Sequence, residues 1–395
     1  MNIIQVRRHA PFENNRRCPS KKMKKFIRVS QPVLGEPESR YVNDALNVGA
    51  ISGFYGEYIS RFEEGFGRYC NARYGVAVSS GTAALHLALA TLSIGRGDEV
   101  LVATLTNMAT FFAVLYQGAK PVPIDIEPDT WNIDPSLLES KITHRTKAIM
   151  VVHLFGHPVD MDPVLELARK HNLRVIEDCA EAHGASYKGK MVGGIGDIGC
   201  FSFYANKIIT TGEGGMMITN DPALAEKARG LKSLAFGSTD KFMHTDVGYN
   251  YRMTNLQAAL GCAQLEKIDS VIQNKRSIAR FYTDQWKDVQ SLQLPVEKSY
   301  ARNVYWMYHV ALQGEFSCKR AEVMQHLNEC GIETREGFIP YNLQDFALSK
   351  GWVKREECPK ANDYARRCFY LPSGPALSSD DLEYVSTSLK DILRG

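Results

Sequence analysis

Short apolar runs alternate with helix-like segments between about residues 72 and 220. The apolar runs are nearly continuous instead of alternating with polar residues, which is typical of strands buried on both faces of a sheet. Predicted strands have the sequences YGVAVSSG, DEVLVATLT, KPVPIDI, KAIMVVHLFG, LRVIEDCA, IGCFSFY and GGMMITN. Predicted helices have the sequences TAALHLALATLSIG, NMATFFAVLYQG, DPSLLESKI and DPVLELARKHN. This alternation predicts an α/β fold with a mostly parallel central sheet.

The pattern changes near residue 255. Residues 254–287 predict a long helix with a possible break, and residues 305–313 predict a strand. Two further helices are predicted, over residues 319–331 and from Ser379 onward. We therefore expect a large domain over residues 28–255 and a smaller α/β domain over residues 256–395.

Composition places the chain among ordinary globular enzymes. Of its 395 residues, 44 % are hydrophobic and 23 % are charged, so a sizeable core can be buried. The net charge of +3 is too small to indicate a nucleic-acid partner. Residues 1–28 carry nine Lys or Arg against one acidic residue. A nucleic-acid arm or a transit peptide would share that composition, but we interpret residues 1–27 as a flexible, solvated extension.

Nine cysteines occur singly, without a C-x-x-C pair. This spacing argues against a zinc site or a disulfide framework and favours a cytoplasmic protein. The histidines also match no metal-binding motif, so no metal site is expected. No window approaches 18 consecutive apolar residues, so no membrane partner is expected.

Three unusual features fall where predicted strands end, and the carboxyl ends of parallel strands are where open α/β sheets bind ligands. The first is SSGTAAL, from Ser79 to Leu85, a small hydroxyl-rich turn between a strand and a helix. The backbone N–H groups of that helix start, with nearby hydroxyls, would suit a phosphate. An ordinary Ser/Thr helix cap is the alternative.

The other two features are an acid and an amine. Asp178 ends an apolar strand, where a carboxylate is costly unless it is paired or caps a turn. Lys207 lies in FSFYANKIITTGEGG, beside Ser202 and Asn206 and before three glycines. A desolvated lysine has a lowered pKa and is a competent nucleophile, although a lysine at a strand edge can also extend to water.

A phosphate cradle, an acid and an amine at one sheet edge match what pyridoxal 5′-phosphate requires. Its phosphate binds a helix start, its ring nitrogen pairs with a carboxylate, and its aldehyde forms a Schiff base with a lysine. We therefore predict that Lys207 holds this cofactor.

With these residues in place, the chain resembles the DegT/StrS family of sugar aminotransferases, from about Arg28 to the C-terminus. Five ordered motifs carry the resemblance: VSQPVLGEPE, VSSGTAALHLAL, VIEDCAEAHGA, GDIGCFSFYANKIITTGEGGM and YNYRMTNLQAALG. The segments FSFYANKIITTGEGGM and NYRMTN look most like those of GDP-perosamine synthases. The family implies the aspartate aminotransferase fold, PLP fold type I.

The resemblance also implies roles for individual residues. Lys207 would carry the cofactor, Asp178 would pair with its ring nitrogen, and Glu181 would lie near its 3-hydroxyl. The phosphate would be held by Gly81, Thr82 and Ser202 of one subunit and by Asn250 of its neighbour in a homodimer. Apart from the resemblance, His183 is a candidate contact of the substrate, with a core or pocket-wall role as the alternative. Arg252 and Arg335 are candidate partners of a carboxylate or diphosphate, with structural ion pairs as the alternative.

Two stretches depart from the family pattern. Asn107 stands where family members carry an aromatic residue against the cofactor ring, which predicts a differently shaped pocket. Glu336 and Asn342 occupy positions where perosamine synthases tend to have proline and histidine. These positions make the cofactor-contacting role of Asn107 and the identity of the sugar open questions.

The expected reaction is a ping-pong transfer of an amino group from glutamate to C4 of a GDP-4-keto-6-deoxymannose-like sugar nucleotide. One alternative keeps this chemistry and uses another keto-sugar nucleotide or a smaller phosphorylated ketone. A PLP-dependent sugar dehydratase is a further alternative, but family dehydratases replace the Schiff-base lysine with histidine, and Lys207 is a lysine. A non-catalytic binding protein is the last alternative, against which the Lys207 and Asp178 pair argues.

Overall fold

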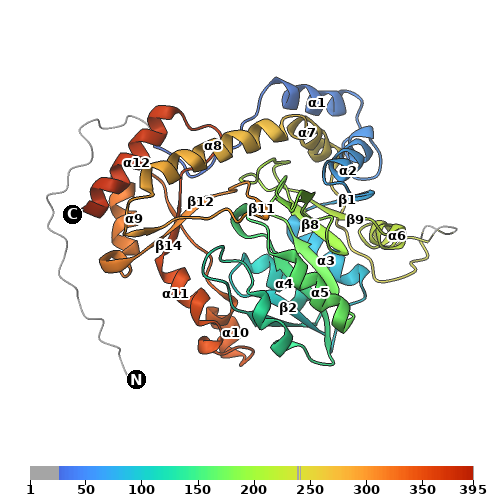
Figure 1. Cartoon of the computed structure of the whole chain (residues 1–395). Coiled ribbons are helices and arrows are strands. Elements are labelled where there is room, and N and C mark those ends of the chain that lie inside the picture. The colour runs from blue at the N-terminus through green and yellow to red at the C-terminus, as the bar shows by residue number, and fades with distance from the viewer. Residues whose placement is uncertain (1–25, 238–239, 241, 395) are drawn as a thin grey trace.

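The computed structural model describes residues 26–237, 240 and 242–394 of the chain (Figure 1). The predicted flexible extension over residues 1–27 therefore lies outside the described residues except for Phe26 and Ile27. Ile27 is buried, and its N–H donates to the carbonyl of Gly331 at 2.8 Å.

The large sheet has seven strands in the order β1-β9-β8-β5-β4-β2-β3. Strand β9 runs antiparallel to both of its neighbours, and the other pairs are parallel, so the predicted mostly parallel sheet is confirmed. The bounds are β1 Tyr74–Val78, β2 Glu99–Ala103, β3 Lys120–Ile124, β4 Thr146–Val152, β5 Arg174–Asp178, β8 Ile198–Ser202 and β9 Gly215–Thr219.

Helices cover both faces of this sheet, because its strands carry apolar side chains on both sides. One face packs against α3 (Gly81–Thr91), α4 (Met108–Tyr116) and α6 (Pro222–Leu231). The other face packs against α2 (Glu57–Tyr69) and α5 (Met161–His171). Helix α7 (Asn255–Leu265) lies on α2 and on α1 (Glu36–Asn47).

A second, antiparallel sheet has the order β10-β12-β14-β13. Helix α8 runs from the end of α7 across the molecule to α12 (Figure 1). The bounds are β10 Leu292–Gln293, β12 Tyr308–Leu312, β13 Arg335–Glu336, β14 Cys368–Leu371, α8 Ile268–Trp286, α9 Arg320–Glu329 and α12 Ser379–Arg394. A small third sheet joins β6 Ser186–Tyr187, β7 Lys190–Met191 and β11 Ala301–Arg302.

The predicted division at residues 255 and 256 remains a prediction. Helix α7 shares its buried residues with the core beneath the large sheet, and α8 begins in that core with Ile268 and Ile272 before it joins the core of the second sheet. The predicted break in the long helix falls at Glu266 and Lys267, between α7 and α8.

One predicted helix is wrong. The segment DPSLLESKI forms two short 3-10 turns, Pro135–Leu137 and Glu139–Lys141, instead of an α-helix. Asp134 accepts the Ser136 N–H at 3.1 Å and caps the first turn. A segment this short has no long apolar face to bury, so the turn chemistry decides its conformation.

Residues 341–362 fasten the part of the chain around the second sheet to the carboxyl ends of the large sheet. The Tyr341 N–H donates to the carbonyl of Thr104 at 2.9 Å, and the Thr104 hydroxyl donates to Asn342 Oδ1 at 2.8 Å. Asp125, just past β3, accepts the Lys360 and Ala361 N–H groups at 3.0 and 2.8 Å and so caps α11 (Pro359–Arg367). Helix α10 (Asp345–Ser349) lies between these anchors.

Across the described ranges, no helix combines the length and the apolar character that crossing a bilayer requires.

Candidate active site

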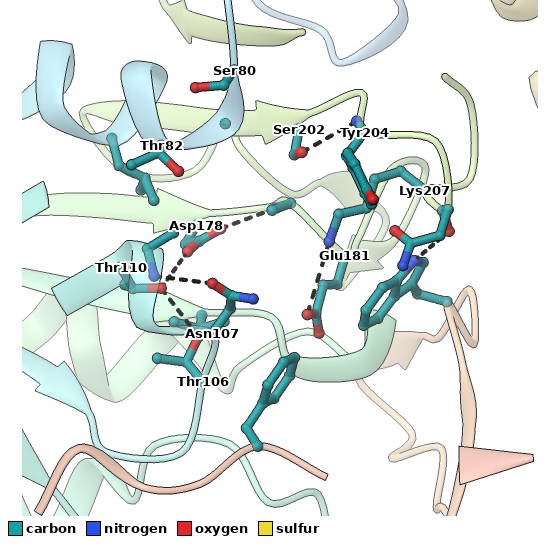
Figure 2. A pocket seen from close by; sticks show the side chains of 18 of the residues that line it. Ser80, Thr82, Thr106, Asn107, Thr110, Asp178, Glu181, Ser202, Tyr204 and Lys207 are labelled. Carbon is teal, nitrogen blue, oxygen red and sulfur yellow. Dashed lines mark hydrogen bonds and ion pairs between the residues drawn. The ribbon is translucent and has the colours of Figure 1, made fainter. Parts of the chain in front are cut away.

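A cavity of about 350 Å³ lies at the carboxyl edge of the large sheet (Figure 2). Two helix starts, two strand ends and the loop after β8 form its floor and sides, and residues between Trp306 and Tyr370 close it. The residues that line it are Ser80, Gly81, Thr82, Leu85, Thr106, Asn107, Ala109, Thr110, Val152, Asp178, Ala180, Glu181, Ser202, Tyr204, Asn206, Lys207, Glu213, Trp306, Arg335, Phe338 and Tyr370.

The start of α3 offers donors for an anion. Ser80 is the N-cap, and its hydroxyl accepts the Ala83 N–H at 3.1 Å. The N–H groups of Gly81 and Thr82 have no intrahelical acceptor at these positions and lie at the cavity. A Cβ on Gly81 would stand 2.6 Å from the Cβ of Ser202, so only glycine lets that serine approach the helix start.

Asp178 ends β5 with its side chain in the cavity (Figure 2). It is only 4 % exposed, and two donors hold it. The Ala180 N–H reaches Oδ1 at 3.1 Å, and the Thr110 hydroxyl reaches Oδ2 at 2.8 Å. Burial raises the pKa of this carboxyl, and the two hydrogen bonds and the nearby Lys207 oppose that rise.

Lys207 follows β8 in a tight loop, where its N–H donates to the carbonyl of Tyr204 at 2.9 Å. Its side chain is 12 % exposed, and its Nζ lies 4.0 Å from Oε1 of Glu181. Burial lowers the pKa of the Lys207 amine, against the charges of Glu181 and Asp178. Burial also raises the pKa of Glu181 to about 7. The site therefore holds a buried amine that loses its proton more readily than an exposed lysine, as a nucleophile requires.

Glycines after Lys207 let its loop return beneath α3. Gly212 has φ +79°, a conformation that favours glycine. A Cβ on Gly215, the first residue of β9, would stand 2.3 Å from the carbonyl oxygen of Ser80. This close contact brings the lysine loop and the helix start to the same cavity.

Asn107 is the N-cap of α4 and lines the cavity. Its Oδ1 accepts the Ala109 N–H at 3.0 Å. Because the cap uses the oxygen, the amide nitrogen faces the side of the cavity where Glu181 lies (Figure 2). Asn107 therefore presents a fixed donor where the resemblance implies an aromatic ring.

The opposite side of the cavity, the second wall, is made of Trp306, Phe338, Tyr370 and Arg335. Glu333 binds the Arg335 guanidinium at 3.1 Å, which keeps this cation at the cavity. Asn342 is not part of this wall. It is fully buried, and its amide nitrogen donates to the Arg355 carbonyl at 2.9 Å and to Asn362 at 3.0 Å.

Three of the predicted site residues do not line the cavity of their own chain. Asn250 is exposed and accepts a 2.7 Å hydrogen bond from Arg252, whose guanidinium lies 4.2 Å from the ring centre of Phe54. His183 is fully buried, edge-on to the rings of Phe66 and Phe201. Burial lowers the pKa of His183 to about 3, so this ring is neutral and packed in the core.

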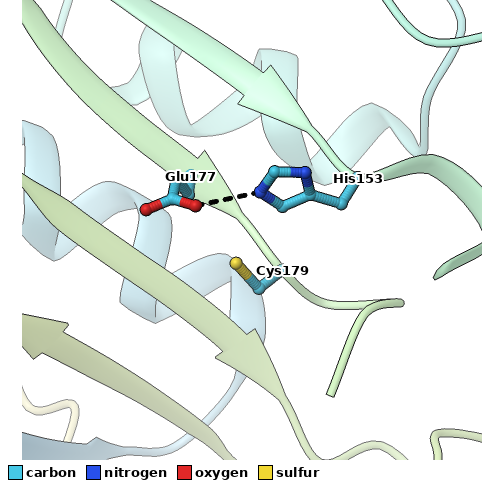
Figure 3. Close-up of side chains that lie close together, drawn as sticks. All are labelled: His153, Glu177 and Cys179. Carbon is cyan, nitrogen blue, oxygen red and sulfur yellow. Dashed lines mark hydrogen bonds and ion pairs between the residues drawn. The ribbon is translucent and has the colours of Figure 1, made fainter. Parts of the chain in front are cut away.

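A second polar cluster lies deeper in the molecule, where His153, Glu177 and Cys179 bring possible metal ligands within 4.8 Å of one another (Figure 3). The side chains of His153 and Glu177 already have hydrogen-bond partners within the chain. Glu177 accepts a 3.0 Å hydrogen bond from His153 and three backbone N–H groups, those of Gly193, Ile195 and Gly196. Burial raises the pKa of the Cys179 thiol well above its usual value. We therefore assign this cluster a structural role.

Sequence reasoning missed Thr110 and most of the second wall. Thr110 belongs to a predicted helix that carried no signal of its own, although it stands one turn from the helix start near Asp178. Trp306 lies 99 residues from Lys207 in the chain and meets it only through the fold.

The residues around the cavity fit pyridoxal 5′-phosphate. They supply N–H groups at a helix start for a phosphate, a buried carboxyl for a ring nitrogen, and a buried amine for an aldehyde. The Asn206 side-chain oxygen is also buried at the cavity without a hydrogen-bond partner in the described chain, as expected of a group that binds a ligand. The fold and this cavity define a PLP-dependent aminotransferase of fold type I.

The chain belongs to the DegT/DnrJ/EryC1/StrS aminotransferase family, whose model matches residues 32–390. It is 44 % identical to a GDP-perosamine synthase of Escherichia coli O157:H7 over 93 % of this chain and 98 % of that protein. It is 38 % identical to a dTDP-3-amino-3,4,6-trideoxy-alpha-D-glucose transaminase of Streptomyces venezuelae over 82 % of this chain and 83 % of that protein.

A solved structure of a putative sugar aminotransferase from Streptococcus pneumoniae, in its PLP form, superposes with a TM-score of 0.88. The two chains are 27 % identical, and the match covers 93 % of this chain and 99 % of that one. The protein is therefore a PLP-dependent sugar aminotransferase.

Proposed function

We propose that the protein transfers an amino group from glutamate to C4 of a GDP-4-keto-6-deoxymannose-like sugar nucleotide in a ping-pong reaction. The observation that carries this proposal is the meeting of the Lys207 amine, the Asp178 carboxyl and the start of α3 around one cavity. The 44 % identity to a GDP-perosamine synthase supports the choice of acceptor.

The first wall of the cavity is its sheet side, and each of its main residues has a role in this proposal: Gly81, Thr82, Ser202, Asp178, Glu181 and Lys207. The N–H groups of Gly81 and Thr82 and the hydroxyl of Ser202 would hold the cofactor phosphate. Asp178, held by Thr110, would pair with the ring nitrogen, and Glu181 would lie near the 3-hydroxyl. When bound, pyridoxal phosphate supplies an electron sink that acidifies the Cα proton of the amino donor.

Lys207 would then carry the proton during the reaction. Its Nζ would take a proton from Cα of the amino donor and, in the second half-reaction, would deliver a proton to the sugar carbon that receives the nitrogen. Burial lowers the pKa of Lys207, which favours the neutral amine needed for this step. The neighbouring Glu181, whose pKa burial raises to about 7, can share the proton.

The second wall would receive the substrates. Arg335 offers a cation for the glutamate carboxylate or for the sugar diphosphate. The rings of Trp306, Phe338 and Tyr370 offer apolar faces for a deoxysugar. Asn342 does not line the cavity, because it binds Thr104 and Asn362 behind this wall. The difference from the histidine that perosamine synthases tend to have at this position therefore affects the wall only indirectly.

We further propose that a second copy of the chain completes the site. Exposed apolar side chains gather between α1 and α2 and in the segment before α7: Val48, Ile51, Phe54, Tyr55, Phe242, Met243 and Val247. Such a patch is typical of an interface. Asn250 and Arg252, which lie beside Phe54 and do not line their own cavity, would reach the cavity of the partner. The cytoplasmic location remains part of this proposal.

The experiment that tests the proposal separates the two half-reactions. The purified protein, loaded with cofactor, is mixed with glutamate and no acceptor, and 2-oxoglutarate is measured. We expect one equivalent of 2-oxoglutarate per site and loss of the absorption band of the lysine-bound cofactor. The isolated protein is then offered a panel of keto-sugar nucleotides that differ in nucleotide and in carbonyl position.

Restoration of the band by GDP-4-keto-6-deoxymannose, and not by dTDP-linked 3-keto sugars, would support the acceptor. Restoration by a dTDP sugar or by a smaller phosphorylated ketone alone would establish the alternative acceptor, to which the 38 % identity to a dTDP-sugar transaminase gives some weight. Release of water from the sugar without transfer of nitrogen would establish a dehydratase.

A further inference from the structure

A tryptophan from the second domain contacts the Lys207 amine directly. The Nζ of Lys207 lies 4.0 Å from the ring centre of Trp306. The indole Nε1–H of Trp306 donates at 2.9 Å to the carbonyl of Asn206, the residue before the lysine. One side chain therefore contacts both ends of the lysine, the backbone at its base and the ammonium group at its tip.

Trp306 is itself held by an unusual turn of the first domain. Its N–H donates to the carbonyl of Phe155 at 2.9 Å, and the Val304 N–H donates to the carbonyl of Gly156 at 3.2 Å. Phe155 has φ +53°, which is rare for a residue with a bulky side chain. Such a conformation is strained and persists where its surroundings determine it.

The surroundings of Phe155 do determine it. Its ring stacks on His309 with centres 4.0 Å apart, and its N–H donates to Oε2 of Glu181 at 2.8 Å. The other carboxyl oxygen of Glu181 lies 4.0 Å from the Lys207 amine. The contacts thus form a closed circuit from Lys207 to Trp306, to Phe155, to Glu181 and back to Lys207.

We propose that Trp306 is a positioning residue for the Lys207 amine, and that the Phe155–Gly156 turn holds Trp306 in place. The circuit fixes the amine between one aromatic face and one carboxyl, so that its tip stays in the cavity instead of extending to water. The inference concerns the geometry of the lysine, and only its consequence for turnover rests on the proposed function.

The chain offers a matched pair of glycines for the test. Gly156 has φ +98°, and a Cβ there would stand 2.8 Å from a methyl group of Val304 and 3.0 Å from the nitrogens of Tyr305 and Trp306. Gly97 has φ +95°, and a Cβ there would meet nothing within 4 Å. Gly156→Ala and Gly97→Ala place an alanine at nearly the same positive φ, but only the first displaces the segment that carries Trp306.

The first measurement is the reactivity of Lys207 in the full chain freed of cofactor. A small acylating reagent is applied across a pH series, and modification of Lys207 is followed by peptide mass spectrometry, with exposed lysines as internal references. The charged groups that face the amine are Glu181 and Asp178, and both remain in every variant. In the wild type, burial should place the midpoint below that of the references.

We expect Trp306→Leu to hydrate the amine and raise the midpoint by about one pH unit or more. Trp306→Phe keeps an aromatic face and loses the donor to Asn206, so its midpoint should remain near the wild-type value. Gly156→Ala should shift the midpoint in the same direction as Trp306→Leu, and Gly97→Ala should not shift it.

The second measurement is the rate at which added pyridoxal phosphate attaches to Lys207, read from its absorption band, followed by kcat and KM of the loaded enzyme. Both Trp306 variants and Gly156→Ala should attach cofactor about tenfold more slowly or worse, and should lower kcat more than they change the KM for glutamate. Trp306→Phe should recover part of the loss in Trp306→Leu.

An unchanged midpoint and an unchanged attachment rate in Trp306→Leu would overturn the proposal and leave Trp306 as a wall of the cavity only. Equal effects of Gly156→Ala and Gly97→Ala would overturn the role of the turn. If Trp306→Leu does not fold, an attachment rate of Trp306→Phe equal to that of the wild type would overturn the role of Trp306. Failure of the proposed sugar acceptor would leave the midpoints and the attachment rates unaffected, because only kcat and KM depend on that acceptor.

Discussion

The hydroxyl of Thr110 donates a 2.8 Å hydrogen bond to Oδ2 of Asp178, and a second threonine, Thr106, lies 3.1 Å behind it. A carboxyl at the buried end of a strand keeps its charge only if donors replace water. The first turn of α4 therefore stabilises the charge on Asp178.

Thr110→Val should remove this donor and keep the shape of the side chain. We expect a loss of about 1–3 kcal/mol in the free energy of unfolding and a further rise in the pKa of Asp178. Cofactor affinity should fall with it. Urea denaturation and titration of the cofactor-free chain with pyridoxal phosphate measure the two effects. Thr110→Ser keeps the hydroxyl and should remain close to the wild type, and equal losses in both variants would contradict this account.

Lys207→Ala should abolish amino transfer while the fold is retained. Removal of the amine deletes both the attachment point of the cofactor and the group that moves the proton, so turnover should fall by more than about 10³-fold. Lys207→Arg keeps a cation near Glu181 but is always protonated, so it should be equally inactive. Circular dichroism and thermal unfolding check that both variants fold. Measurable turnover above a few per cent in either one would remove Lys207 from the reaction.

Two variants of Asn107 can distinguish its role as the cap of α4 from its expected contact with the cofactor. Asn107→Ser keeps a cap acceptor for Ala109 and removes the amide donor, so stability should be retained and cofactor affinity should fall several-fold. Asn107→Ala loses both and should cost about 1 kcal/mol of stability in addition. Thermal unfolding and cofactor titration distinguish the two. Wild-type affinity in Asn107→Ser would mean that the amide nitrogen contacts no part of the cofactor.

The buried Glu181 should give stability a pH dependence of known sign. Its pKa is raised from 4.5 to about 7, so between these pH values the folded chain holds a proton that the unfolded chain has released. The free energy of unfolding therefore falls as pH rises through this window. Glu181→Gln should gain stability relative to the wild type across pH 4.5 to 7, by up to about 3 kcal/mol, and then level off.

Urea denaturation of the cofactor-free chain at several pH values measures this difference. Glu226→Gln, on the exposed surface of α6, is the control and should show a flat difference. A flat difference for Glu181→Gln as well would show that its carboxyl is already ionised in the folded chain at pH 5.

Local patterns predicted the sheet and the first wall of the site. Continuous apolar runs define the buried parallel strands, and Asp178 and Lys207 stand within a few residues of strand ends that the topology must bring to one edge. The glycines after Lys207 marked the loop in the same way. Such features depend on neighbours in the chain, so a single sequence displays them.

The parts that were missed depend on distant contacts. Trp306 reaches Lys207 only because the Val304–Trp306 segment pairs with the backbone of Phe155 and Gly156. Asn342 stands out in the sequence because perosamine synthases tend to have histidine there, but its side chain is buried and binds Thr104. His183 follows Asp178 by only five residues, yet its side chain packs against the rings of Phe66 and Phe201 in the core and does not line the cavity.

The two walls of the cavity come from separate stretches of chain, so one wall can change in sequence without the other. The wall that contains Asp178 and Lys207 is set by strand ends, whereas Arg335 and Phe338 belong to a connection anchored at its far side by Thr104 and Asp125. In the proposed function, exchange of that connection would change the choice of acceptor and leave the Lys207 and Asp178 side of the cavity unaltered. A chimera that exchanges only this connection is therefore the variant to make when a different amino sugar is wanted as the product.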